Sequence, residues 1–277
     1  MAPAQRFIHL AHGVRLHYAE QGDPGGLPIV MLHGITDSWR SFESVMAHLP
    51  ASLRVFALSQ RGHGESDRPG SYRTRDFAGD AAAFIEALGL GPALVVGHSM
   101  GSVNAMRLAI DRPDLLRGLA TAGTFASFSD KAELIEFNRS AIAPLRDPID
   151  PGFAAEWQRS TLAQPVPPAF FDMVVRECLQ APAVVWRDAF AALFDDDFSA
   201  EIDRIVVPTL VVWGDRDAMC PPGDQERVIR AIKGSRLLTY AGAGHALHWE
   251  EPARFANDLA SFASTLASPT LSKETFQ

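Results

Sequence analysis

Short apolar runs recur along the first 124 residues of the chain, separated by polar turns or by stretches with helical periodicity. Continuously apolar runs predict strands buried on both faces of a sheet, whereas alternation predicts a half-exposed strand. Strands are predicted at 7–11, 14–21, 28–32, 54–58, 93–96 and 116–122, and helices at 42–49, 75–88 and 103–111. This order is typical of an α/β fold, a mostly parallel sheet with helices on both faces.

The alternation stops between residues 125 and 204, where the chain is rich in aromatic side chains and interrupted by prolines. Four short helices are predicted there, at 130–143, 152–161, 168–180 and 182–194. Strands then resume at 208–213 and 235–240, with helices at 222–232 and 252–266. We therefore expect a core domain formed by 1–124 and 205–267, an inserted helical cap at 125–204 and a flexible tail at 268–277. Such a cap would cover the sheet edge where α/β folds bind ligands.

A candidate nucleophile follows the predicted strand at 93–96. The sequence Gly97-His98-Ser99-Met100-Gly101 has the pattern Gly-X-Ser-X-Gly and lies between a strand and a helix, as a nucleophile elbow requires. The serine of such a turn takes a left-handed backbone conformation, and the chain passes too close to both glycines for either to carry a Cβ atom. The pattern is weak on its own in a chain with 21 glycines, so the hypothesis depends on the partners of Ser99.

Two further residues can supply those partners. A serine hydroxyl needs a base, and the base needs an acid that orients it. His245 follows the last predicted strand, and Asp217 follows the strand before it. The chain order Ser99, Asp217, His245 is the order expected for this kind of site. Because all three residues follow strands of one parallel sheet, we expect them to converge at its carboxyl edge.

Acyl transfer also passes through a tetrahedral oxyanion, which needs two backbone donors. The first predicted donor is the N–H of Met100, the residue after the candidate nucleophile. The second is the N–H of Ile35, in the loop that follows the strand at 28–32. Gly34 lets the chain turn at that point.

Composition narrows the classes of binding partner that the chain is expected to have. The formal net charge is −8, which argues against nucleic acid and anionic membrane surfaces, because both require basic patches. No apolar run approaches the length of a membrane span, and the N-terminus shows no signal-peptide pattern, so a cytoplasmic protein is expected. Cys178 and Cys220 are expected to stay reduced. His245 and His248 have the spacing of metal ligands, but no third ligand is near in the sequence, and no metal is expected.

Together these motifs resemble the α/β-hydrolase superfamily, specifically its serine-nucleophile members with a helical cap. The resemblance covers essentially the whole chain and rests on five segments: His33-Gly34, Arg61-Gly62-His63-Gly64, Gly97 to Gly101, Gly214-Asp215-Arg216-Asp217 and Gly244-His245. It implies an eight-stranded sheet with an antiparallel second strand, a cap between strands six and seven, and no cofactor. The Gly-X-X-Asp spacing of the family favours Asp217 over Asp215 as the acid.

The chain departs from this family's pattern at two positions. Ser59 stands where many relatives have Asp, a difference expected to be structural. Thr36 stands where epoxide hydrolases commonly have Pro, and the nucleophile is Ser99 where epoxide hydrolases and dehalogenases usually have Asp. Both of those activities are therefore disfavoured.

The main hypothesis is a serine hydrolase of carboxylic esters or lactones with a small hydrophobic substrate. Alternatives with the same triad are a C–C bond hydrolase of ring-cleavage products and a cofactor-free perhydrolase of the haloperoxidase type. A ligand receptor without significant turnover is a more remote alternative. The candidates for the substrate pocket are aromatic: Trp39, Phe125, Phe128, Trp157 and Trp186. The oligomeric state and the specific substrate are not encoded in any motif.

Overall fold

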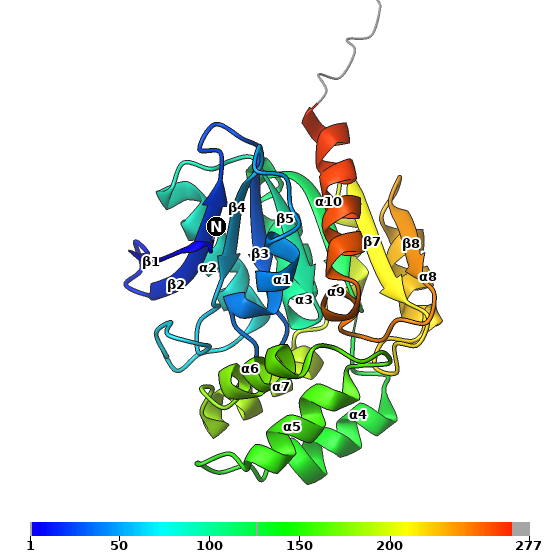
Figure 1. Ribbon diagram of the computed structural model, residues 1–277. Helices are drawn as coiled ribbons and strands as arrows, with labels where there is room; N and C mark the ends of the chain where they lie inside the picture. Colours follow the sequence, from blue (N-terminus) through cyan, green and yellow to red (C-terminus); the bar gives the residue numbers. More distant parts are fainter. Residues whose placement is uncertain (1, 126, 268–277) are drawn as a thin grey trace, which may run out of the picture.

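The computed structural model of the chain describes residues 2–125 and 127–267, so the predicted tail at 268–277 lies outside the described residues. Eight strands form one sheet in the order β1-β2-β4-β3-β5-β6-β7-β8 (Figure 1). Their bounds are β1 Ala4–His9, β2 Arg15–Gly22, β3 Pro28–Leu32, β4 Arg54–Leu58, β5 Ala93–His98, β6 Leu116–Ala122, β7 Thr209–Gly214 and β8 Arg236–Tyr240. β2 pairs antiparallel with β1 and β4, and the other neighbours pair parallel. This confirms the predicted sheet.

The strand order reverses at β3, because the chain adds β4 on one side of it and β5 on the other. In open α/β sheets, ligands bind outside the carboxyl ends of the strands at such a point. The register pairs Leu32 of β3 with Gly97 of β5, so the loops that follow these two strands start side by side. One loop contains Ile35 and the other contains Ser99.

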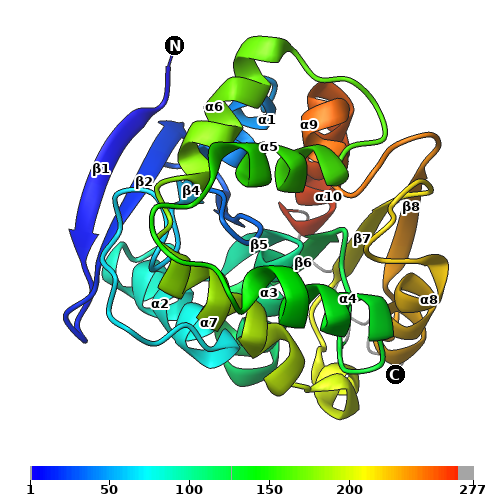
Figure 2. The ribbon, with the colours of Figure 1, turned by 90° about the horizontal axis from the view of Figure 1, so that it is seen from below.

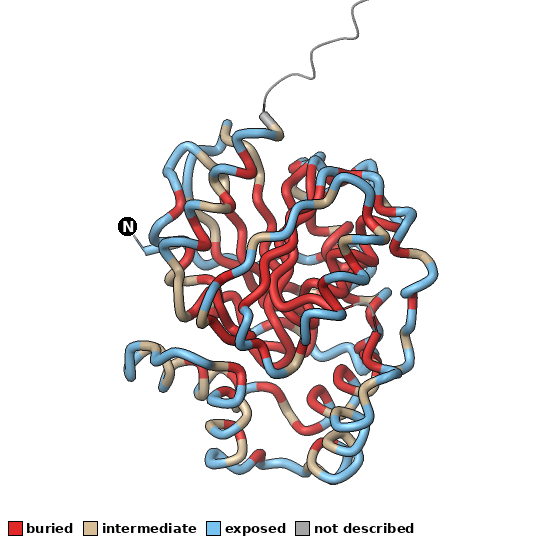
Figure 3. Tube along the Cα trace, turned by 90° about the vertical axis from the view of Figure 1, so that its right-hand side faces the viewer, coloured by how far each residue is buried: buried red, intermediate tan, exposed pale blue. Residues whose placement is uncertain are grey.

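Alternate residues of the central strands enter two hydrophobic layers, one on each face of the sheet. In β5, Val95 belongs to one layer, and Leu94 and Val96 belong to the other. The first layer is covered by α2 (Thr74–Ala87), α3 (Met100–Asp111) and α8 (Pro222–Ala231). The second is covered by α1 (Glu43–Met46), α9 (Leu247–Glu250) and α10 (Pro252–Ala267). Figure 3 shows the buried segments gathered in the middle of the core, with exposed segments around them.

The segment between β6 and β7 forms a separate group of helices across one end of the sheet. It contains α4 (Ala132–Phe137), a π-helical turn (Asn138–Ile142), α5 (Pro151–Ser160), α6 (Pro168–Cys178) and α7 (Ala183–Asp195). Figure 2 shows these helices surrounding the ends of β5 and β6. We refer to residues 125–204, of which residue 126 is not described, as the cap.

The main differences from the predicted elements concern the first strand and several single helical turns. The strand expected at 7–11 is β1 (Ala4–His9), so it begins and ends closer to the N-terminus. The helix expected at 42–49 is a 3₁₀ turn (Trp39–Phe42) followed by the short α1, and the helix expected at 130–143 is divided between α4 and the π-helical turn. Sequence periodicity missed α9 and the 3₁₀ turns Pro113–Leu115 and Ser199–Arg204, because one turn holds too few residues to show a period. None of the described helices has the length and apolar character needed to cross a membrane.

Candidate active site

Ser99 occupies a strained turn between β5 and α3. Its backbone angles are φ 51° and ψ −120°, a combination that side-chain-bearing residues rarely adopt. A Cβ atom on Gly97 would lie 2.2 Å from the carbonyl oxygen of Gly101, and one on Gly101 would lie 2.0 Å from that of Leu32. Ser102 Oγ donates to the carbonyl of Ser99 over 2.6 Å and helps to hold the turn. The local backbone therefore explains both glycines of the Gly-X-Ser-X-Gly pattern.

His245 and Asp217 are paired in the structure. His245 Nδ1 donates to Asp217 Oδ2 over 2.9 Å, and the other carboxylate oxygen accepts from the backbone N–H groups of Met219 (2.8 Å) and Cys220 (2.9 Å). Burial alone would raise the pKa of Asp217, but the attraction to His245 and these three hydrogen bonds outweigh it and lower the pKa below its usual value. Asp217 is therefore held as an anion that orients the imidazole.

The alternative acid lies apart from this pair. Asp215 is exposed, and its Oδ1 accepts from the backbone N–H of Gly242 over 2.6 Å.

Of the hydrogen bonds between described residues, none joins Ser99 Oγ to His245, although both residues line one cavity. Such a contact commonly shortens only when substrate binds.

Two neutral histidines pack behind His245. His98 Nε2 donates to the carbonyl of His245 over 3.1 Å, and its ring centroid lies 4.2 Å from that of His248. Burial, followed by the electrostatic effect of His245, lowers the pKa of His98 to about 3. Burial also lowers the pKa of His248 well below its ordinary value. These rings hold the backbone of His245 in place without adding positive charge.

The loop that contains Ile35, the second candidate oxyanion donor, is held by three hydrogen bonds. His33 Nδ1 donates to the carbonyl of Gly34 over 2.7 Å, and Thr36, at φ 65°, donates from Oγ1 to the carbonyl of Ile35 over 2.7 Å. Cys178 of the cap donates from Sγ to Thr36 Oγ1 over 3.3 Å. Among the described residues, no protein acceptor is bound to the backbone N–H of Ile35 or of Met100. Both groups are therefore free to hold a ligand oxygen.

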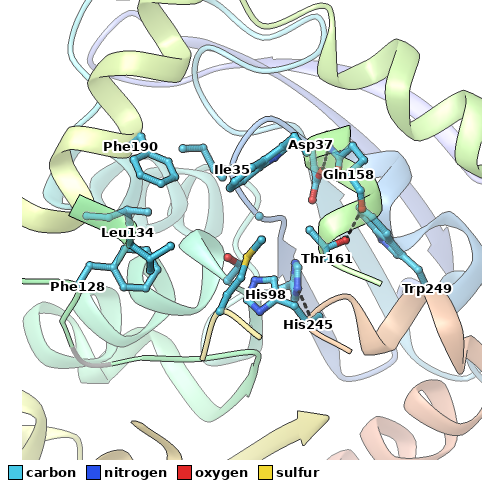
Figure 4. A pocket seen from close by; sticks show the side chains of 15 residues that line it. Ile35, Asp37, His98, Phe128, Leu134, Gln158, Thr161, Phe190, His245 and Trp249 are labelled. Carbon is cyan, nitrogen blue, oxygen red and sulfur yellow. Dashed lines mark hydrogen bonds between the residues drawn. The ribbon is translucent and has the colours of Figure 1, made fainter. Parts of the chain in front are cut away.

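The cavity above Ser99 is small and divided into two kinds of wall. Its volume of about 20 Å³ is close to that of one water molecule. Figure 4 shows aromatic and aliphatic side chains on one side and Asp37, Gln158 and Thr161 on the other. The lining consists of Gly34, Ile35, Asp37, His98, Ser99, Phe128, Leu134, Trp157, Gln158, Thr161, Phe190, Leu193, Met219, His245 and Trp249.

An outer apolar groove of about 410 Å³ lies beside this cavity, between α4 and α5. It shares Leu134, Trp157 and Met219 with the cavity lining. These three side chains therefore form the partition between the groove and the cavity.

Two of the five predicted aromatic pocket residues line the cavity, namely Phe128 and Trp157. The other three do not line it, and two of them, Phe125 and Trp186, pack behind the lining. Phe125 stacks on Phe128 at 3.6 Å between ring centroids, and Trp186 packs edge-on against Trp157 at 6.1 Å. Trp39 is buried in the layer on the other face of the sheet, below the guanidinium of Arg40.

Sequence reasoning missed the polar wall and Trp249. Asp37 lies only two residues after Ile35, so its place in the predicted oxyanion loop was the one available signal. Gln158 and Thr161 lie at the end of α5 and enter the site only because the cap folds over it. Trp249 belongs to α9, a one-turn helix that periodicity missed.

Asp217, Cys220 and His245 offer donor atoms within 4.8 Å of one another, an arrangement that could suggest a metal site. However, the carboxylate and the imidazole already bond to each other. Burial raises the pKa of the Cys220 thiol well above its usual value, and a thiol must lose its proton to bind a metal. The donor set therefore fits an oriented base better than a metal centre.

The comparisons with known proteins agree with this fold. The profile described as "Alpha/beta hydrolase family" matches residues 29–258. The AB hydrolase superfamily protein YisY of Bacillus subtilis (strain 168) is 29% identical over 259 residues, which cover 87% of this chain and 92% of that protein. A non-heme chloroperoxidase of Streptomyces lividans is 27% identical over 279 residues, covering 93% of this chain and 99% of that protein.

The solved structures give the same result. A thermophilic esterase from Thermogutta terrifontis superimposes with a TM-score of 0.82 at 26% identity, covering 96% of this chain and 100% of that one. The family profile spans most of the chain, and the order and direction of the strands agree with the fold that the sequence motifs implied. The chain therefore belongs to the α/β-hydrolase family, a family of hydrolase enzymes.

Proposed function

We propose that this protein is a serine hydrolase of carboxylic esters or lactones that works through an acyl-enzyme intermediate. The observation that carries the proposal is the His245–Asp217 pair, which faces the same cavity as Ser99 at its strained turn. The relatives support it as well, because one solved structure at 26% identity is an esterase.

In this mechanism the Ser99 oxygen attacks the substrate carbonyl, and His245 takes the hydroxyl proton. Because Nδ1 of His245 is bonded to Asp217, Nε2 is the nitrogen that accepts this proton. The N–H groups of Ile35 and Met100 stabilise the tetrahedral oxyanion, and His245 returns the proton to the leaving alcohol. Water then attacks the acyl-enzyme by the same route and releases the acid.

A fluorophosphonate should label Ser99 and abolish ester hydrolysis. This reagent reacts with a serine only where a neighbouring base and oxyanion donors activate it. Intact-mass spectrometry is expected to show one adduct, and peptide mapping should place it on Ser99. The matched control is Ser264→Ala, which removes an exposed hydroxyl on α10 and should leave labelling unchanged. An adduct on another side chain, or hydrolysis that survives complete labelling, would contradict the proposal.

The bond that is cleaved can be identified with a small panel. Rates for p-nitrophenyl butyrate, a γ-lactone and a vinylogous diketone separate esterase, lactonase and C–C hydrolase activity. Hydrogen peroxide added to the ester reaction tests perhydrolysis, the reaction type suggested by the name of the Streptomyces relative. We expect the ester or the lactone to be hydrolysed fastest, and a dominant rate with the diketone would replace the proposed bond specificity.

A further inference from the structure

Asp37 places a carboxyl group inside the apolar cavity of the candidate active site. The side chain is only 4% exposed and lines the cavity together with Ser99 and His245. It is the one carboxyl group among the lining residues, because Asp217 lies behind His245. Figure 4 shows it beside Gln158 and Thr161, opposite Phe128, Leu134 and Phe190.

No cation accompanies this carboxyl group. Among the ion pairs between described residues, none includes Asp37, and the nearby Arg40 pairs with Glu43 and Glu177. The titratable groups that face it are His245, His98 and the thiol of Cys178 on α6, with His248 reached through Ser41. Burial keeps His98 and His248 neutral, as described above, and burial raises the pKa of Cys178 to about 12.

Asp37 also retains unused capacity to accept hydrogen bonds. Gln158 Nε2 donates to Oδ1 over 3.1 Å, and Ser41 Oγ donates to Oδ2 over 3.4 Å, which is a long contact. A carboxylate has about four acceptor positions, so one is left even when the backbone N–H of Gly34 is counted as a third donor. Burial raises the pKa of Asp37 to about 7, although the bonds from Gln158 and Ser41, the attraction to His245 and the bond from the Gly34 backbone oppose this.

A buried carboxylate without a cation is costly, and such groups occur mainly where function requires them. We propose that Asp37 is a specificity residue that accepts a hydrogen bond from the substrate, so that the preferred esters or lactones carry a hydroxyl or N–H group close to the scissile carbonyl. The inference rests on the proposed hydrolase function and names its substrate class. The facing aromatic wall holds the apolar part of the same molecule, and Gln158 fixes the orientation of the carboxyl group from the cap.

The test compares esters that differ only in the donor. On the acyl side the pair is methyl 3-hydroxybutanoate and methyl butanoate, with methyl 3-aminobutanoate as the cationic arm. On the alcohol side the pair is 2-hydroxyethyl acetate and propyl acetate. The measured quantity is the ratio of kcat/KM for the donor ester to that for the plain ester. Intrinsic reactivity cancels when this ratio is compared between wild type and a variant.

Asp37→Leu, which has a similar shape but no acceptor, should lower the ratio by roughly tenfold for at least one pair, the loss expected for one hydrogen bond. Asp37→Asn should lower it less for the hydroxyl ester than for the amino ester, because the amide keeps an acceptor but loses the charge. Asp150→Asn is the matched control: this exposed residue caps α5, the helix of Gln158, and its replacement should leave every ratio unchanged.

A second measurement uses the wild-type protein alone. Below pH 7 the Asp37 carboxyl gains a proton, so the donor-to-plain ratio should fall several-fold between pH 8 and pH 6. Any effect of pH on the bond-breaking steps that the two esters share cancels in the ratio. The inference is overturned if the ratio is the same in wild type and Asp37→Leu for both pairs, or if it does not depend on pH in wild type. Absence of any Ser99-dependent hydrolysis would instead overturn the proposed function.

Discussion

Ser99→Ala is expected to lower kcat/KM for p-nitrophenyl acetate by roughly 10⁴ to 10⁶, the loss typical of removing a serine nucleophile. The variant cannot form the acyl-enzyme, and the rate that remains should come from substrate binding and from the proposed oxyanion donors Ile35 and Met100. Steady-state kinetics of purified wild type and variant measure the effect, and circular dichroism checks that the fold is intact. A variant within tenfold of wild type would remove Ser99 from the mechanism.

The triad also predicts a pattern among variants. His245→Ala should cost about as much as Ser99→Ala, and the double variant should be no slower than either single one, because the two residues act as a unit. Asp217→Asn should lower kcat by about 10⁴, since the amide no longer holds the correct tautomer of His245. Asp215→Asn is the matched control: this exposed carboxylate lies two residues away and bonds only to the Gly242 backbone among the described groups, so its loss should change kcat little.

The fold could be predicted because its signals are local. Strands buried on both faces are mostly apolar, so β3, β4 and β6 were predicted with the bounds that the structure shows. The nucleophile elbow was recognisable for a similar reason. The backbone lies about 2 Å from any Cβ atom added to Gly97 or Gly101, so the residue at φ 51° has to be flanked by glycines, and this requirement is written into five consecutive residues.

The cavity lining could not be predicted, because it depends on how the cap packs. Trp157 and Trp186 are both aromatic residues on cap helices, and only the contact between their helices determines that Trp157 faces the cavity and Trp186 lies behind it. Asp37 presents the same difficulty in a loop. Acidic residues in loops are common, and the sequence does not show that Gln158, more than a hundred residues later, closes over this one.

Asp37→Asn is expected to make the protein more stable at pH 8, although it impairs substrate selection. The carboxyl group has an ordinary pKa of 3.8, which applies to the unfolded chain, and a pKa of about 7 in the folded protein. The folded state therefore binds more protons between these values, and stability falls as the pH rises through this range. The free-energy cost of burying the ionised carboxyl group is absent below pH 4 and complete above pH 7. The pKa difference then corresponds to roughly 4 kcal/mol.

Asparagine has no charge to bury, so the variant escapes this cost, and weaker hydrogen bonds to Gln158 and Ser41 offset part of the gain. We expect a net increase of about 2 kcal/mol in the free energy of unfolding at pH 8. Urea denaturation measures it, and the advantage over wild type should shrink by about 2 kcal/mol at pH 5.5. Asp150→Asn, at the exposed N-cap of α5, should show no such gain.

If Asp37→Asn were equally destabilised at both pH values, Asp37 would be a structural residue that connects the cap to the loop of Ile35. A variant that is more stable but less selective would show that this carboxylate is kept in the cavity for its substrate, at the expense of the fold.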